Sequence, residues 1–143
     1  MVLVTAVILA CSSSPPSNIR NSCEIFEEKD DWYADAYDSY EKWGVPVHVQ
    51  MATIYQESKF IGNAQTPRKY TLGIIPMGRV SSAYGYSQAL DGTWEDYRND
   101  TGRWRARRDD IDDATDFMGW YFAATQAELG ISMADARNQY LAY

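Results

Sequence analysis

The chain has 143 residues, which is enough for one domain with a single hydrophobic core. Hydrophobic residues make up 45% of it and aromatic residues 14%, which excludes a disordered chain. Its formal net charge of −7 argues against nucleic-acid binding, because phosphate backbones are recognised by clustered Lys and Arg.

The N-terminus is predicted to be a targeting segment rather than part of the fold. Residues 1–10 are uncharged and mostly aliphatic, too short to span a bilayer but typical of the core of a secretory signal. Residues 8–11 resemble a bacterial lipobox, which implies lipidation of Cys11, with residues 11–21 as a flexible Ser- and Pro-rich linker. The alternatives are a small cytosolic chain with an apolar end, or a disulfide from Cys11 to Cys23.

Apolar residues at helical spacing predict an all-α domain over residues 22–143. In the first long helix, the Trp and Tyr side chains and Ala36 are expected to face inward together. The next helix is apolar nearly all round, so we expect it to be the buried central one. Later helices are expected to turn Leu90 and Leu129 inward. The predicted helices span residues 24–28, 30–43, 46–58, 87–99, 109–129 and 133–143.

A long connection around residues 62–84 interrupts the helices, and it contains several Gly and Pro residues. Connections of this length in compact domains are usually functional. Its apolar residues 72–77 are expected either to pack over or beside a groove, or to form a hairpin tucked on the surface. We therefore predict an irregular loop or hairpin insertion in the helical domain.

Glu57 ends the nearly uncharged stretch 45–55 and is the first candidate for chemistry. If this carboxyl lies in a cleft, desolvation raises its pKa and makes it a proton donor near neutral pH. The alternative is an ordinary glutamate in solvent at a helix end. Eleven tyrosines and five tryptophans fit either an aromatic core or a cleft lined with rings, which suits sugars.

No metal or cofactor site is predicted. The aspartates of residues 109–116 lack the central glycine and distal glutamate of a calcium loop, and an acidic helix start explains them. The basic cluster in residues 103–108 directly precedes them, so we expect the two groups to neutralise each other. His48, the single histidine, is expected to be structural.

Three motifs occur in order along the chain. Residues 44–60 contain Gly-Val-Pro and Ala-Thr-Ile-Tyr-Gln-Glu-Ser-Lys-Phe, residues 83–88 read Ala-Tyr-Gly-Tyr-Ser-Gln, and residues 141–143 read Leu-Ala-Tyr. Together they resemble the lytic transglycosylases with a goose-lysozyme-like SLT domain, in particular a branch of small bacterial lipoproteins. The resemblance implies a mainly α, lysozyme-like fold. The family's third motif continues as Asn-x-Gly, so the domain is expected to extend past Tyr143.

The resemblance also implies an activity. The family cleaves the β-1,4 bond between N-acetylmuramic acid and N-acetylglucosamine in peptidoglycan and forms 1,6-anhydromuramic ends. Its glutamate of Glu-Ser is the catalytic acid/base, a role that falls on Glu57. The alternatives are a lysozyme-type hydrolase and a non-catalytic wall-binding lipoprotein.

Substrate binding is implied for the second and third motifs and for a serine that precedes the glycine. In the second motif Tyr86 and Ser87 replace the family's Leu and Met. The implied partners are glycan strands and, through lipidated Cys11, a membrane; we expect a monomer in the bacterial envelope, at the periplasmic face of the outer membrane. The implied substrate-binding residues are Ser81, Ser82, Tyr86, Ser87, Gln88 and Tyr143.

Overall fold

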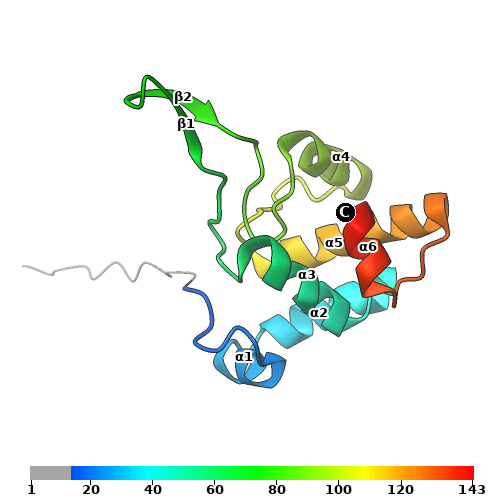
Figure 1. Ribbon diagram of the computed structural model, residues 1–143. Helices are drawn as coiled ribbons and strands as arrows, with labels where there is room; N and C mark the ends of the chain where they lie inside the picture. Colours follow the sequence, from blue (N-terminus) through cyan, green and yellow to red (C-terminus); the bar gives the residue numbers. More distant parts are fainter. Residues whose placement is uncertain (1–13) are drawn as a thin grey trace, which may run out of the picture.

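A computed structural model describes residues 14–143 of the chain, so the predicted signal segment and Cys11 lie outside the described residues. The described part contains six helices and one small hairpin, which confirms the predicted mainly α class with an insertion (Figure 1). No helix in it is long and apolar enough to span a bilayer. The elements are α1 (Ser22–Glu28), α2 (Trp32–Trp43), α3 (Val47–Ser58), β1 (Arg68–Thr71), β2 (Ile75–Arg79), α4 (Asp91–Thr101), α5 (Ile111–Leu129) and α6 (Ala136–Ala142).

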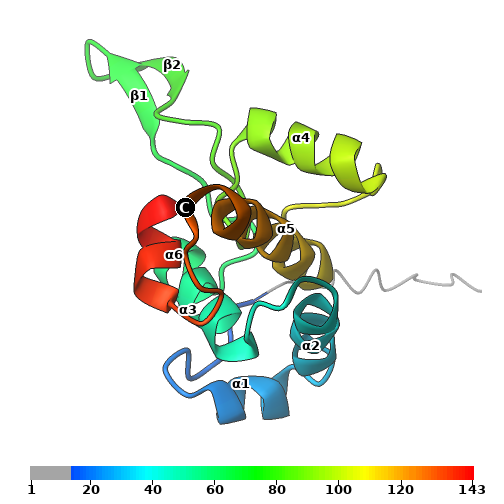
Figure 2. The ribbon, with the colours of Figure 1, turned by 90° about the vertical axis from the view of Figure 1, so that its right-hand side faces the viewer.

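Helix α5 runs through the middle of the molecule and contacts α2, α3, α4 and α6, while α1 lies at the lower edge (Figures 1 and 2). Its own sequence explains this position, because buried residues occur on all sides of its first three turns. Helix α2 packs along it closely: a methyl group on Gly119 of α5 would collide with the indole of Trp43. Ser39 of α2 also donates a hydrogen bond of 2.7 Å to the carbonyl of Thr115 in α5. The α2–α5 pair is therefore the rigid base on which α3 and α6 lie.

The inner face of α2 differs from the prediction. Ala36 and Ser39 are buried, with 0% and 2% of their surface exposed, because small side chains let the two helices approach. The tyrosines lie on the next stripe of the helix, where the 3.6-residue period turns them toward solvent. These three residues, Tyr33, Tyr37 and Tyr40, are 50%, 40% and 42% exposed, so their predicted inward orientation was wrong.

A buried carboxylate, Asp116 in α5, joins three parts of the fold. It accepts hydrogen bonds from the side chains of Lys42 (2.8 Å) and Trp43 (2.8 Å) at the end of α2. It also accepts one from Tyr97 of α4 (2.7 Å) and pairs with Arg103 at 3.2 Å. Burial raises the pKa of Asp116, but the hydrogen bonds from Lys42, Tyr97 and Trp43 outweigh this cost, so the pKa is lowered overall.

The predicted neutralisation of the basic cluster by the acidic run holds for Arg103 and Arg107 but not for the whole cluster. Arg103 contacts Asp112 and Asp113, at 2.5 Å and 2.7 Å, so it ties the loop before α5 to the first turn of that helix. The remaining ion pairs of the cluster join Arg107 to Asp109 and Arg108 to Asp91.

Helix α4 begins four residues later than predicted and α6 three residues later. Residues 84–90 form an irregular turn because backbone N–H groups bond outside it: Gly85 donates to the Ala64 carbonyl and Tyr86 to the Arg108 carbonyl, both at 3.0 Å. Two residues predicted to face inward do not, since Leu90 is 48% and Leu129 60% exposed.

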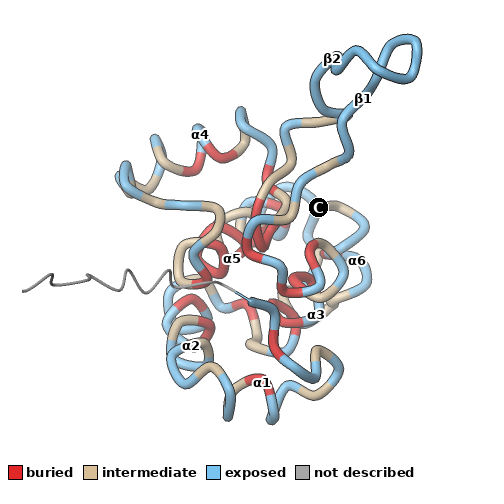
Figure 3. The backbone as a smooth tube through the Cα atoms, turned by 90° about the vertical axis from the view of Figure 1, so that its left-hand side faces the viewer, coloured by how far each residue is buried: buried red, intermediate tan, exposed pale blue. Residues whose placement is uncertain are grey.

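The insertion is an antiparallel hairpin that projects from the helical body (Figure 3). Every residue of β1 and β2 is exposed. Leu72 and Ile74 at the tip are 85% and 79% exposed, so the expectation that residues 72–77 pack over a groove or lie tucked on the surface was wrong. The sequence period of a two-stranded hairpin does not reveal whether one of its faces has a partner.

Candidate active site

Glu57 lies in the last turn of α3, where the chain leaves the helix abruptly. Lys59 and Phe60 both take left-handed backbone angles, with φ of 54° and 61°. Such angles are uncommon for residues other than glycine, and two in a row are held by their surroundings. The Phe60 ring supplies the anchor, because it is only 1% exposed and packs in the main core. The core therefore fixes the backbone immediately beyond Glu57.

Glu57 is half-buried, and burial raises the pKa of its carboxyl. A hydrogen bond from the Tyr140 hydroxyl offsets part of that rise, because it stabilises the ionised form. The carboxylate is also close enough to Tyr143 to help raise the pKa of that phenol, after burial, which is the larger cause. Glu57 thus has the environment of a carboxyl that keeps its proton to higher pH than an exposed one.

Two hollows are each lined by one of the tyrosines that interact with Glu57, although Glu57 itself lines neither. One, of about 200 Å³, lies between α3 and α6 and is lined by Gln56 and Tyr140 among others. The other, of about 130 Å³, is lined by Gln88 and Tyr143 together with side chains of α5. Tyr140 and Tyr143 both interact with Glu57, so the walls of both hollows include a side chain that acts on this carboxyl or is acted on by it.

The glycine motif brings its backbone close to the loop before α5. Gly85 has φ of +82°, and any Cβ there would collide with the Arg108 carbonyl. This close approach lets residues 86–88 turn back toward α6. The Tyr143 hydroxyl donates a hydrogen bond of 2.6 Å to the Ser87 carbonyl, so the second and third motifs meet.

Gln88 is held in place by its amide nitrogen. Nε2 donates to the carbonyls of Ala64, at 3.0 Å, and Gly85, at 2.8 Å. Its Oε1 receives no hydrogen bond from the described residues, so it is the atom through which Gln88 can accept one from a ligand in the adjoining hollow.

The other predicted substrate-binding residues do not line these two hollows. Tyr86 is 3% exposed and its ring meets Trp32 edge to face, while Ser87 is fully buried. Ser81 is bonded to Thr66 at the base of the hairpin, and the Ser82 hydroxyl accepts from the Asp91 N–H at the start of α4. These four residues position backbone around the site, and their contact with substrate stays a prediction.

Sequence reasoning missed Tyr140 as a partner of Glu57. The signal was present, because Tyr140 and Tyr143 are three residues apart and so lie on one face of a helix. What the sequence could not give was the orientation of α6 against α3.

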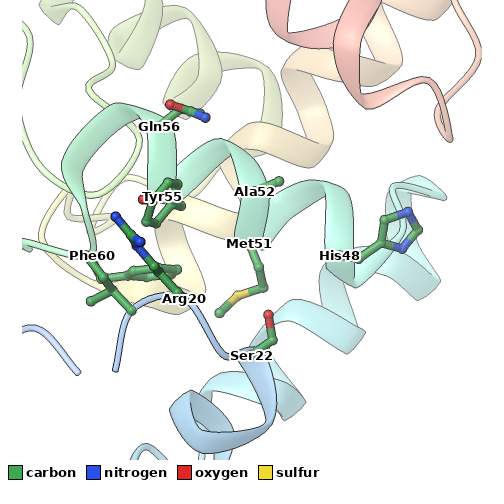
Figure 4. Close-up of a pocket in the computed structure, with 9 residues that line it drawn as sticks. Arg20, Ser22, His48, Met51, Ala52, Tyr55, Gln56 and Phe60 are labelled. Atoms are coloured by element: carbon green, nitrogen blue, oxygen red, sulfur yellow. The ribbon is translucent and has the colours of Figure 1, made fainter. Parts of the chain in front are cut away.

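A larger hollow, of about 340 Å³, lies along α3, and Glu57 does not line it either. Arg20, Tyr55 and Phe60 gather at one end and His48 lies at the other (Figure 4). His48 is exposed here rather than part of the core. No group of three or more His, Cys, Asp or Glu within residues 14–143 is arranged to hold a metal ion.

A family model described as the transglycosylase SLT domain matches residues 1–143. The chain belongs to this family. No curated protein and no solved structure matched it. Membership confirms the resemblance found in the motifs and supports a transglycosylase-type function on peptidoglycan. In this SLT domain Glu57 of the first motif is a half-buried carboxyl that interacts with one tyrosine from the wall of each hollow.

Proposed function

We propose that the protein is a lytic transglycosylase that cleaves the β-1,4 bond between N-acetylmuramic acid and N-acetylglucosamine and leaves a 1,6-anhydromuramic end. The observation that carries this proposal is the placement of Glu57 in an SLT domain. Burial raises the pKa of Glu57, and its partners Tyr140 and Tyr143 each line one of the two hollows.

In the proposed reaction Glu57 first acts as general acid and protonates the oxygen of the leaving sugar. The resulting carboxylate then acts as base and removes the proton from the 6-hydroxyl of the muramoyl residue, whose oxygen closes on C1. The proton balance is complete without water, because Glu57 gives one proton and recovers one.

The surroundings of Glu57 fit a mechanism with one carboxylate. Glycosidases of the usual kind hold two carboxyl groups across the bond. Among the described residues, no carboxylate contributes to the shifted pKa of Glu57. The substrate's own N-acetyl group is therefore assigned the stabilisation of the oxocarbenium-like transition state.

The roles proposed for the substrate-binding residues follow their positions. Gln88 offers Oε1 to a sugar hydroxyl or amide, and the Tyr143 ring forms part of the wall of its hollow. Ser81, Ser82, Tyr86 and Ser87 support the backbone of this wall. We also propose the envelope location, with Cys11 lipidated and the domain at the outer membrane; incorporation of a labelled fatty acid that is lost in Cys11→Ser tests it.

The test of the reaction is digestion of purified peptidoglycan by the Glu57→Gln variant, with Glu128→Gln as the matched control on the exposed end of α5. We expect anhydromuropeptide release to fall at least about a hundredfold in Glu57→Gln and to be unchanged in the control. Product mass distinguishes the rivals: reducing ends instead of anhydro ends indicate a hydrolase. Wall binding without soluble products from the unmodified chain indicates a non-catalytic binding protein.

A further inference from the structure

The β1–β2 hairpin has no packing partner within the described chain. It stands clear of the helices in two perpendicular views (Figures 1 and 2). A two-stranded hairpin with no packed face is at best marginally stable in water. The exposed apolar side chains that it carries include Tyr70, Leu72, Ile74, Ile75 and Met77, between 50% and 85% exposed.

These apolar side chains occur on both faces of the hairpin as well as at its tip. Tyr70 pairs with Pro76 in the strand register, and Thr71 pairs with Ile75. Because successive residues of a strand point to opposite faces, Tyr70 and Ile75 lie on different sides. A partner that covers one flat face would leave the other face and the tip in water. A fluid apolar environment, by contrast, can cover both faces and the tip at the same time.

The base of the hairpin is basic, in contrast to the chain as a whole. Residues 58–90 contain Lys59, Arg68, Lys69 and Arg79 and no Asp or Glu, whereas the formal net charge of the chain is −7. Arg68 and Arg79 are direct cross-strand partners. Like charges in such a pair are unfavourable unless an anion lies beside them. Within residues 14–143, none of the three cations of the hairpin pairs with a carboxylate.

We propose that the hairpin is a membrane-insertion element: its tip, Leu72 to Ile75, enters the surface of an anionic lipid bilayer, and Arg68, Lys69 and Arg79 bind the headgroups. The aliphatic tip suits acyl chains rather than glycan, which packs on aromatic rings. The cations suit anionic lipid, since basic residues near such a surface are attracted to it and extend their charged ends to headgroup level.

The length of the hairpin agrees with this arrangement. Four to five residues separate the tip from Arg68, a distance of roughly 15 Å for extended chain. Interfacial protein segments enter the headgroup and acyl boundary by about 5–10 Å. With the tip at that depth, the arginine pair lies among the phosphates and outside the hydrocarbon.

The test measures, in the full chain, whether the tip of the hairpin is surrounded by water or by lipid. An environment-sensitive fluorophore is attached at Ile74→Cys in a protein with Cys11→Ser and Cys23→Ser. The matched control carries the fluorophore at Leu129→Cys, a second exposed apolar position. With vesicles of phosphatidylethanolamine and phosphatidylglycerol, we expect a blue shift and protection from aqueous quencher at position 74 and neither at position 129.

Two pairs of variants separate the apolar and charged contributions. The double variant Leu72→Gln with Ile75→Gln should raise the lipid concentration that gives half of the fluorescence change by roughly tenfold. The control double variant, Trp104→Gln with Leu129→Gln, should leave this concentration unchanged. Arg68→Gln with Lys69→Gln should remove the preference for phosphatidylglycerol over phosphatidylcholine vesicles, and Arg20→Gln with Arg105→Gln should not.

Three results would overturn the proposal. The fluorophore at position 74 stays in water while vesicles are present; its signal changes with protein concentration alone, which indicates a second copy of the chain; or it responds to lipid-free cell-wall sacculi and not to vesicles. None of these outcomes depends on whether Glu57 is catalytic.

Discussion

The Tyr140 hydroxyl is hydrogen-bonded to the Glu57 carboxyl, one turn of α6 before the tyrosine of the third motif. Tyr143 itself donates to the Ser87 carbonyl instead. The two tyrosines therefore have different tasks: Tyr140 acts on the charge of Glu57, and Tyr143 joins α6 to the glycine motif.

This division predicts a change in pH dependence for Tyr140→Phe. Loss of the hydrogen bond removes the one contact that lowers the pKa of Glu57, so that pKa rises further. Because the proposed general acid must be protonated, the alkaline limb of the kcat/KM profile moves to higher pH. The measurement is anhydromuropeptide release across pH, with Tyr37→Phe on exposed α2 as the control. An alkaline limb in the wild-type position would show that Tyr140 does not act on Glu57 during turnover.

The sequence predicted a helix well where a clear hydrophobic periodicity occurs together with capping residues at both helix ends. Asp110 caps α5 and Gly130 ends it, close to the predicted limits. Position in the chain also identified Glu57 as the end of a helix that is mostly buried. Period alone does not choose between adjacent stripes of one helix, which is why the tyrosines of α2 were predicted to face inward.

Contacts between distant segments were beyond sequence reasoning. Asp116 was interpreted as part of an acidic helix start, but its partners come from α2, α4 and the intervening loop. Tyr140 was missed for the same reason, since only the docking of α6 on α3 brings it to Glu57. Such pairings depend on tertiary geometry that no local pattern encodes.

Gly85→Ala should be strongly destabilising. Its φ of +82° disfavours any side chain, and the added methyl group would collide with the Arg108 backbone, which cannot move aside as a flexible side chain could. We expect the free energy of unfolding to fall by about 2–4 kcal/mol. Gly130→Ala is the control: its φ is +70° with nothing within 4 Å, so only the backbone cost of about 1 kcal/mol applies. Equal losses in urea unfolding would argue against the close approach at Gly85.

Asp116→Asn should also destabilise, because it leaves the donors of Lys42, Tyr97 and Arg103 without their shared carboxylate. We expect a loss of about 3 kcal/mol at neutral pH, compared with under about 0.5 kcal/mol for Asp109→Asn, whose partner is at the surface. The folded pKa of Asp116 is lowered, so its stabilisation is present above the ordinary carboxyl range and is lost as pH falls through the folded value. The difference from wild type should therefore shrink in strong acid; a constant difference would assign the effect to shape rather than charge.

Asp35→Asn, in contrast to Asp116→Asn, should increase the free energy of unfolding. Burial first, and then the nearby aspartates of α2 and α5, raise the pKa of Asp35 to about 6. Since its ordinary value is 3.8, ionising it in the folded state costs stability as pH rises through this interval. The side chain keeps some solvent contact, so we expect the variant to gain only about 1 kcal/mol at pH 7.5, well below the full linkage value.

The gain from Asp35→Asn should disappear as pH falls toward about 3, below the ordinary value of 3.8, where both states hold the proton. Asp96→Asn, on the exposed side of α4, removes one negative charge that is not among those raising the pKa of Asp35, and serves as the control. Urea unfolding of the three proteins at both pH values decides the matter. A gain at pH 7.5 shared by Asp96→Asn would assign the effect to the net charge of −7, and a gain that persists at low pH would exclude ionisation of Asp35 as its cause.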